Sequence, residues 1–384
     1  MKPKVLIMAG YYLPGVKAGG PIRSIKNLVD NLIIEHDFYV TALDRDLSDT
    51  IAYSSINIDK WDRLEGANEK IYYRGKDILS YFRLIKNIRK ENFNVIYLNS
   101  FFSFQDTLLT LILIKLGLLK TNKTILAPRG QFSSGALNIK ETKKKLYLKL
   151  FKILDLNNLV TWHSTSEQEN KDIKRYFHNV QVVTISNLSK DNIDSIELNK
   201  NIIKKKGTLK LVYIGRIHPI KNIKVIFESL VGLSGKIEFN LYGPIEDNLY
   251  WEKCLQVSEK LGSDVIVIYH GVLENKFVRN MLRENHVFIS ISHGENFGHS
   301  IVEALKTFTP AIISDRTPWN QLVDFKAGFN VEVDDVVSLI DSINQYIFMG
   351  QEEFDESCKG AKQYIDARLS TKKEIEKYIQ LFKV

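Results

Sequence analysis

The sequence predicts an α/β protein with two doubly wound, Rossmann-like domains that face a central cleft. Short β-branched apolar runs alternate with helical patterns along the 384 residues, which is typical of parallel sheets flanked by helices. The chain is too long for one ordinary domain and long enough for two. A polar segment rich in lysine and asparagine, residues 189–207, interrupts the alternation midway and favours an interdomain linker there.

We therefore expect an N-terminal domain over residues 1–190, a linker over 191–207, a C-terminal domain over 208–368 and a last helix over 369–384. No strand follows that helix, and we expect it to pack back toward the N-terminal domain.

The expected strands are short, as buried parallel strands are. Those of the first domain are Val5–Gly10, Phe38–Leu43, Val95–Asn99, Thr124–Ala127, Val160–His163 and Val182–Ile185. Those of the second are Leu209–Ile214, Ile237–Tyr242, Val265–Tyr269, Val287–Ile291, Ala311–Ser314 and Phe329–Val333. Helical patterns in the first domain cover Pro21–Ile34, Ile78–Glu91, Asp106–Leu119 and Lys143–Leu154.

Composition is that of a globular protein in a reducing compartment. Hydrophobic residues make up 44% and charged residues 26% of the chain. Cys254 and Cys358 stand far apart and form no metal-binding or redox pattern. The first apolar run is short and is followed at once by glycines, so we expect a first β-strand rather than a signal peptide. These features predict a cytoplasmic protein.

Two segments raise the question of membrane contact. The longest apolar stretch, Thr107–Leu119, contains Lys115 and is too short to span a bilayer, so it is either a buried helix or a membrane-facing one. In residues 140–152 lysines interleave with leucines and aromatic residues, the pattern of a basic amphipathic helix. The net charge of +8 suits an anionic partner. Two interpretations remain open: a solvated surface helix, or peripheral contact with the inner face of an anionic membrane.

The most informative motif lies in Ile289–Leu305, with the sequence ISISHGENFGHSIVEAL. A buried strand leads into a loop that carries Glu295, and a helix begins near Gly298, so that Glu303 lies one turn inside the helix. The start of a helix offers backbone N–H groups and the positive end of the dipole, which suit a phosphate. Gly298 lets a ligand approach the backbone closely.

A second motif follows the first strand of the second domain, where Gly215-Arg216 and Lys221-Asn222 enclose four residues. A diphosphate carries concentrated negative charge, and Arg216 and Lys221 can clamp it from one loop.

A third motif, Gly19-Gly20 before Pro21, follows the first strand of the chain. A glycine loop and a proline near a helix start suit close backbone approach to a phosphate or an acceptor. No strict G-x-G-x-x-G occurs here, which argues against a dinucleotide oxidoreductase.

Taken in order, these motifs resemble the retaining GT-B glycosyltransferases, in particular glycosyltransferase family 4 of bacterial surface-polysaccharide clusters. Glu295 and Glu303 match the E-x7-E motif of that family, and residues 215–222 match its G-R-x4-K-N signature. The resemblance covers essentially the whole chain. It implies catalytic roles for Arg216 and Lys221 on the donor diphosphate and for Glu295 on the donor sugar.

The resemblance also implies a wider donor site, in which Glu303 binds the ribose hydroxyls and a Gly-Gly loop reaches the diphosphate. The donor-binding residues expected on this basis are Gly19, Gly20, Gly215, Tyr242, Gly243, Gly271, Val272, Asn296, Phe297, Gly298, Ser300 and Glu303. On the acceptor side it implies Arg129 and His163, and a buried structural role for His163 is the alternative. Many members place a catalytic-loop histidine after the strand that here is Val95–Asn99. Residues 95–102 contain no histidine, so this catalytic role is not assigned to any residue here.

No metal and no cofactor are expected. Asp44-Arg45-Asp46 is a literal D-x-D, but it lies in the first domain with an arginine between the carboxylates, and we interpret it as a strand-end loop. Arg216, Lys221 and a helix dipole can neutralise the leaving diphosphate without a metal.

The sequence therefore predicts retaining, metal-independent transfer of a sugar from a nucleotide-diphosphate sugar to a saccharide acceptor, lipid-linked, in the biosynthesis of a cell-surface polysaccharide such as O-antigen, capsule or exopolysaccharide. No nucleic-acid partner is expected. Two alternatives remain. A nucleotide-sugar epimerase of the same fold would need further acid–base carboxylates, and a non-catalytic nucleotide-sugar-binding protein would not need the intact set of charged residues.

Overall fold

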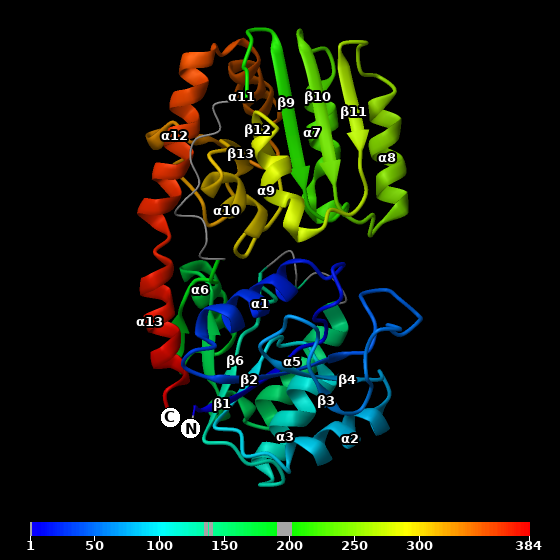
Figure 1. The fold of residues 1–384 in the computed structure, drawn as a ribbon, viewed down its shortest axis with the longest axis vertical. Helices are drawn as coiled ribbons and strands as arrows, with labels where there is room; N and C mark the ends of the chain where they lie inside the picture. Colours follow the sequence, from blue (N-terminus) through cyan, green and yellow to red (C-terminus); the bar gives the residue numbers. More distant parts are fainter. Residues whose placement is uncertain (1, 134–136, 138–140, 190–201) are drawn as a thin grey trace. The chain divides into compact units, whose positions relative to one another are not determined.

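The computed structural model describes residues 2–133, 137, 141–189 and 202–384 (Figure 1). The chain divides into two compact units, residues 1–190 together with 371–384, and residues 191–370. The last helix, α13 (Thr371–Phe382), therefore belongs to the first unit. Most of the expected linker, residues 191–201, lies outside the described residues, and residues 202–207 lead into the first strand of the second unit.

The first unit contains an eight-stranded sheet in the order β3-β4-β2-β1-β5-β6-β7-β8. Only β3 is antiparallel to its neighbour, and every other pair is parallel. The strands are β1 (Lys4–Met8), β2 (Asp37–Leu43), β3 (Trp61–Asp62), β4 (Lys70–Arg74), β5 (Val95–Leu98), β6 (Lys123–Leu126), β7 (Thr161–Ser164) and β8 (Val182–Thr184). The sequence prediction missed β3 and β4, because the apolar part of β4 is only three residues long and charged residues flank it.

Helices cover both faces of this sheet. They are α1 (Gly20–Leu32), α2 (Ile78–Ile88), α3 (Thr110–Lys115), α5 (Glu141–Ile153), α6 (Glu167–Tyr176) and α13. Side chains of α2, α3, α5 and α6 share one hydrophobic core, while α1 and α13 share the other. Alternate residues of β1 enter the two cores, Leu6 on one face and Val5 and Ile7 on the other. Burial on both faces explains why these strands are continuously apolar.

The second unit contains a six-stranded parallel sheet in the order β11-β10-β9-β12-β13-β14. Counted from its first strand, this is the 3-2-1-4-5-6 order of a Rossmann fold, which reverses direction between β9 and β12. The strands are β9 (Thr208–Ile214), β10 (Lys236–Tyr242), β11 (Val265–Tyr269), β12 (Val287–Ser290), β13 (Ala311–Ser314) and β14 (Gly328–Val331).

Helices α7 (Ile223–Leu230), α8 (Asn248–Ser258) and α11 (Val336–Phe348) contribute to one core of the second unit, and α9 (Asn275–Arg283), α10 (His299–Lys306) and α12 (Gln351–Arg368) to the other (Figure 1). Both units are therefore doubly wound α/β layers, as the sequence predicted.

The apolar stretch Thr107–Leu119 does not form one helix. It begins inside a π-helical turn, Phe104–Leu109, continues as α3 and ends after Lys115. Leu108 and Leu111 are buried, whereas Leu116 and Leu118 are exposed. Among the described residues, no helix has the length and apolar character needed to span a membrane.

Candidate active site

The predicted donor residues of the second unit lie where its sheet reverses direction. Strand β9 pairs with β10 on one side and with β12 on the other, all parallel. The loop after β9 carries Arg216 and Lys221, and the loop after β12 carries Glu295. Neighbouring parallel strands end at the same edge of a sheet, so the two loops meet there. In open α/β sheets, this crevice outside the strand ends is where ligands bind.

The two loops are joined by a direct charge contact. The ammonium group of Lys221 forms an ion pair with the carboxylate of Glu295, and these side chains are 15% and 22% exposed. The carbonyl oxygen of Ile220 accepts hydrogen bonds from the backbone N–H of His293 at 2.8 Å and from Ser292 Oγ at 3.0 Å. This framework holds a cation and an anion together at the strand ends while leaving both partly accessible.

Arg216 has a partner that the sequence interpretation did not include. Its Nη1 atom lies 2.6 Å from Oε2 of Glu246, which follows β10. The backbone N–H of Glu246 donates to the carbonyl of Ile217 at 3.1 Å, so the carboxylate is fixed beside the arginine loop. Glu246 was missed because it belongs to no local motif, and only the pairing of β10 with β9 brings it to Arg216.

Two predicted glycines are needed for close backbone contact. The buried phenol of Tyr213 donates to the carbonyl of Arg216 at 2.8 Å, and a Cβ on Gly215 would lie 2.6 Å from the same phenol oxygen. Gly243 has φ 139°, and a Cβ there would lie 1.9 Å from the carbonyl oxygen of Gly215. Burial raises the pKa of Tyr213 well above its ordinary value, so the phenol stays protonated and keeps donating. These contacts set the path of the Arg216 loop.

Helix α10 begins where the sequence predicted. Gly298 is its N-cap residue with φ 75°, and a Cβ there would lie 2.8 Å from Ile301 Cδ1 and 3.1 Å from Glu295 Cγ. The positive end of the helix dipole therefore lies next to the Glu295 loop, which favours an anion at this edge. Asn296 precedes the cap, Ser300 is in the first turn and Glu303 is one turn further along the helix.

The loop before α10 is held by an aromatic contact. The carbonyl of Phe297 accepts a hydrogen bond from the indole N–H of Trp319, and the two rings meet edge to face with centroids 5.6 Å apart. Phe297 is buried in the core that also contains side chains of α10, so it fixes this loop to the protein interior. Trp319, which follows β13, therefore anchors this loop.

Four further residues of the predicted donor site lie at the ends of β10 and β11. The Tyr242 ring stacks on His270 with centroids 4.4 Å apart and planes 8° apart. The backbone N–H of Gly243 donates to the carbonyl of Gly271 at 2.7 Å, and Gly271 has φ 77°. Val272 is half exposed. The structure thus brings all four predicted residues together at one corner of the sheet.

In the first unit, Gly19 is the N-cap residue of α1 with φ 63°, and Gly20 and Pro21 open the helix. The carboxylate of Asp46 accepts hydrogen bonds from the backbone N–H groups of Val16 at 2.7 Å and Lys17 at 3.0 Å. Asp46 therefore anchors the glycine loop from the end of β2.

The other aspartate of the D-x-D sequence is also engaged by protein groups. Asp44 Oδ1 lies 2.7 Å from Nε of Arg45. In the part of the chain that the structure describes, no group of three or more His, Cys, Asp or Glu side chains is arranged to hold a metal ion.

The two predicted acceptor-side residues are held by polar contacts within the first unit. Arg129, with φ 58°, donates to Asn99 Oδ1 at 2.7 Å and to the Tyr97 phenol at 2.8 Å. His163 is fully buried, and its Nδ1 lies 2.7 Å from the Tyr97 oxygen. Its Nε2 lies 3.0 Å from the carbonyl of Ile185.

Burial and the nearby Arg129 charge lower the pKa of His163 to about 3, so the ring is neutral at physiological pH. Both ring nitrogens of His163 are therefore engaged by groups of the first unit.

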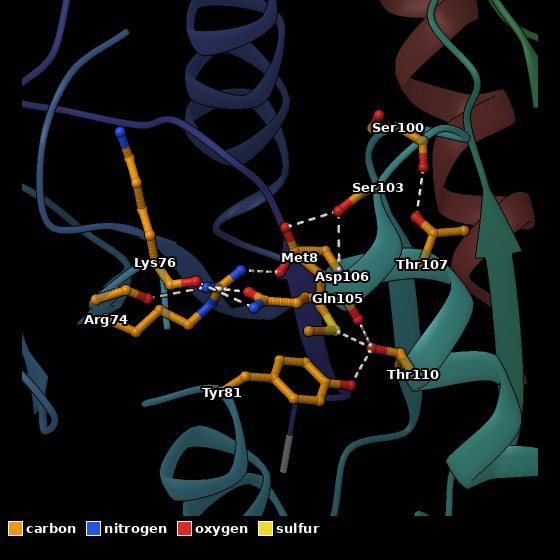
Figure 2. A network of polar contacts seen from close by, with 11 residues as sticks. Met8, Arg74, Lys76, Tyr81, Ser100, Ser103, Gln105, Asp106, Thr107 and Thr110 are labelled. Atoms are coloured by element: carbon orange, nitrogen blue, oxygen red, sulfur yellow. Dashed lines mark hydrogen bonds and ion pairs between the residues drawn. The ribbon is translucent and has the colours of Figure 1, made fainter. Parts of the chain in front are cut away.

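A second polar network follows β4 and β5 (Figure 2). Arg74, only 2% exposed, forms an ion pair with Asp106 at 2.6 Å and donates to Gln105 Oε1 at 2.7 Å. Ser103 Oγ accepts the backbone N–H of Asp106 and caps the π-helical turn. Sequence reasoning missed this network because Arg74 lies in the unrecognised strand β4. It fixes the segment that follows β5, where the sequence lacks the histidine that many family 4 members carry.

Comparison with known proteins agrees with this architecture. Residues 194–364 match the family model described as glycosyl transferases group 1. A protein of Klebsiella pneumoniae described as an uncharacterized 41.2 kDa protein in the cps region is 24% identical over 308 residues, which cover 78% of this chain and 81% of that protein.

Solved structures resemble the whole chain. Anabaena HepE in complex with UDP and glucose has a TM-score of 0.75 at 13% identity, with 99% of each chain covered. Sucrose-phosphate synthase of Thermosynechococcus elongatus has a TM-score of 0.73 at 15% identity, with 99% of this chain and 98% of that chain covered. A variant of S. aureus TarM in complex with Fondaparinux, alpha-GlcNAc-glycerol and UDP has a TM-score of 0.72 at 13% identity, with 100% of each chain covered. The likenesses confirm the predicted GT-B fold class, and together with the group 1 domain they support a glycosyltransferase.

Proposed function

We propose that this protein is a retaining glycosyltransferase that moves a sugar from a nucleotide-diphosphate sugar to a saccharide acceptor. The observation that carries the proposal is the Lys221–Glu295 ion pair at the switch point of the second sheet, beside the N-terminus of α10, with Arg216 on the same loop as Lys221. Two cations and the N-terminus of a helix, at the edge of the sheet where the strands end, form a site for a diphosphate.

In this proposal the protein cations take the place of a metal. Glycosidic cleavage develops positive charge on the sugar and negative charge on the departing diphosphate. Arg216 and Lys221 would stabilise that negative charge, and Glu295 would orient the sugar. The ion pairs with Glu246 and Glu295 hold the two cations at the strand ends before the donor arrives. Such preorganised charges reduce the reorganisation needed in the transition state.

The stereochemical proposal is attack by the acceptor hydroxyl on the same face of the sugar from which the diphosphate leaves. It rests on the resemblance to family 4 and on the sequence of the first unit, in which no carboxylate stands out as a nucleophile. Asp46 accepts backbone hydrogen bonds, and Asp44 and Asp106 are paired with arginines. A covalent glycosyl-enzyme would require a free carboxylate at the sugar.

The related proteins support the proposed substrates. HepE has been seen with UDP-glucose, and TarM with UDP and a glycosylated glycerol. The Klebsiella relative lies in a cps region, which supports a role in the biosynthesis of a cell-surface polysaccharide. We extend the proposal to a lipid-linked saccharide as acceptor and to family 4 as the subgroup.

Incubation of the purified protein with radiolabelled nucleotide sugars, with and without saccharide acceptors, tests the proposal. We expect acceptor-dependent transfer, and NMR of the product should show the anomeric configuration of the donor. A changed sugar formed without an acceptor would instead identify an epimerase. Tight binding without any turnover across the panel would identify a non-catalytic binding protein, and an inverted product would exclude the retaining mechanism.

A further inference from the structure

Helix α5 is attached to the first unit by one face only. Leu148 and Phe151 are buried in the core on that side of the sheet, where the Phe151 ring lies 4.7 Å from Phe101 and 6.2 Å from Trp162 between centroids. The phenol of Tyr147 donates to the carbonyl of Phe101 at 2.7 Å. These contacts fix which face of the helix points away from the core.

The outward face carries a second apolar stripe. Leu146 and Ile153 are each 69% exposed, and Leu150 is 39% exposed. At 3.6 residues per turn, the three side chains fall within about 60° of one another around the helix. We call these three residues the α5 stripe. A helix buried on one face normally presents polar residues on the other, so the exposed leucines and isoleucine of the α5 stripe depart from the usual pattern.

Further exposed apolar residues lie at the end of α3. Leu116 is 65% exposed and Leu118 is 46% exposed. The ammonium group of Lys115 donates to the carbonyl of Leu154 at 2.7 Å, directly after α5, so this end of α3 lies next to the end of α5. Exposed apolar residues are therefore present at the adjoining ends of α3 and α5.

Lysines flank the α5 stripe. On a helical projection, Lys143 and Lys149 each lie about 60° from Leu146, on opposite sides, and Lys145 and Lys152 lie further round. All four are exposed. The acidic residue in the described part of this helix is Glu141, in its first turn, which pairs with Lys145. A central apolar line with cations on both sides is the pattern of a helix that lies in the interface of an anionic bilayer.

We propose that the α5 stripe and its flanking lysines form the surface by which this protein docks on an anionic lipid bilayer. A protein partner fits less well, because lysine is depleted at the centres of protein interfaces. The inference deepens the proposed function, since it would bring the enzyme to a lipid-linked acceptor, but it rests on residues that take no part in the donor site.

Sedimentation with vesicles tests the proposal on the full-length protein. The wild type should bind vesicles of phosphatidylglycerol and phosphatidylcholine at low salt, and should bind pure phosphatidylcholine vesicles far more weakly. The triple variant K143E/K145E/K149E should lose at least about 100-fold in partition coefficient, since each lysine near an anionic surface contributes about fivefold. The triple variant L146Q/L150Q/I153Q should lose at least about tenfold, because it removes the apolar stripe while keeping good helix formers.

Matched variants control for charge and for apolar exposure. K372E/K373E/K377E reverses three exposed cations on α13, which packs in the other core of the same unit, and L249Q/I266Q/V337Q changes three scattered exposed apolar residues. Both controls should bind vesicles within about threefold of wild type. If K143E/K145E/K149E or L146Q/L150Q/I153Q binds like wild type while circular dichroism shows an intact fold, or if the α13 control loses as much, the proposal is wrong.

Activity toward a water-soluble acceptor separates this proposal from the proposed function. The stripe and lysine variants should transfer sugar to a soluble saccharide at the wild-type rate. Failure of wild type to bind vesicles, with such transfer intact, would remove the membrane surface and leave the glycosyltransferase assignment in place. Vesicle binding without transfer to any acceptor would keep the membrane surface and remove the glycosyltransferase assignment.

Discussion

At the scale of single residues, Lys221 links the two loops on which the proposed donor site depends. Its ion pair with Glu295 joins the loop after β9 to the loop after β12. Arg216, on the same loop as Lys221, forms a separate ion pair with Glu246. Both cations belong to side chains that remain partly exposed. Removing either one should therefore affect ligand chemistry more than folding.

We expect Arg216→Ala and Lys221→Ala each to lower kcat/KM by an amount equivalent to about 2–4 kcal/mol of transition-state stabilisation. The reason is that each removes a charged donor from the leaving diphosphate. Lys224→Ala is the matched control, since Lys224 lies on the next helix and pairs with Glu228. Steady-state kinetics with the donor decide the question, and near-wild-type turnover in either cation variant would exclude the clamp.

Gly243 provides a test of backbone packing at the site. A Cβ there would lie 1.9 Å from the carbonyl of Gly215 and would have to adopt φ 139°. We expect Gly243→Ala to lower the free energy of unfolding of its unit by at least about 2 kcal/mol. Gly262→Ala is the control, because a Cβ at Gly262 meets no atom within 4 Å and φ is not positive. Equal denaturation midpoints for the two variants would contradict the packing argument.

At the scale of structural elements, buried polar contacts between strands and helices explain where sequence reasoning fell short. Each local motif was found because its residues are close in sequence, as in Gly215–Asn222 and Glu295–Glu303. Glu246, the network of Arg74 and the surroundings of His163 depend instead on strand order. The π-helical turn at Phe104–Leu109 is likewise held by Arg74, 32 residues before Asp106, and no periodicity in the sequence indicates it.

The Arg74–Asp106 pair should matter for stability. We expect Arg74→Met to lower the free energy of unfolding by about 3–5 kcal/mol, because it leaves the Asp106 carboxylate buried without its cation. The double variant Arg74→Met with Asp106→Leu should be less destabilised than the single variant, since it leaves no charge behind. Chemical denaturation of both variants measures this. A double variant at least as unstable as the single one would show that the charge pair is not the cause.

His163 lies on β7 and contacts three other elements of its unit. Its ring meets Tyr97 of β5, the carbonyl of Ile185 directly after β8, and Tyr378 of α13. Burial lowers its pKa to about 3. The unfolded chain would bind a proton near pH 6.5 while the folded protein would not, so this group makes stability fall as the pH decreases from about 6.5 toward 3. In proton–carbon NMR spectra, we expect the ring signal that disappears in His163→Gln to show no titration between pH 8 and pH 5. A midpoint near pH 6.5 would contradict its burial.

At the scale of the whole molecule, the fold was the most predictable property. The alternation of apolar runs and helical patterns located the strands of the second sheet to within two residues at each end. The reason is that strands buried on both faces are apolar throughout. In the first unit the same signal failed only for β3, which has two residues, and for β4, whose three apolar residues stand between Lys70 and Arg74. The identities of the proposed donor sugar, nucleotide and acceptor depend on the shapes of loops. No periodic pattern of apolar residues in the sequence indicates those shapes.

The molecule should work without a metal ion. We expect transfer activity to persist in excess EDTA, because Arg216, Lys221 and the α10 dipole are assigned to the diphosphate. The carboxylates of Asp44 and Asp46 are occupied by protein donors. Assays with and without EDTA check this directly. Complete loss of activity in EDTA, restored by Mn²⁺ or Mg²⁺, would show that a metal ion is needed to neutralise the charge of the leaving diphosphate.

Calorimetric titration with nucleoside diphosphates and the matching monophosphates tests the central claim, that the switch point of the second unit binds the donor diphosphate. Charge-assisted hydrogen bonds to the second phosphate should make the diphosphate bind at least about tenfold tighter than the monophosphate. In the double variant Arg216→Ala with Lys221→Ala, this difference should disappear while weak binding of the nucleoside remains. Equal affinity for the two nucleotides in wild type, or an undiminished preference for the diphosphate in the double variant, would contradict the account.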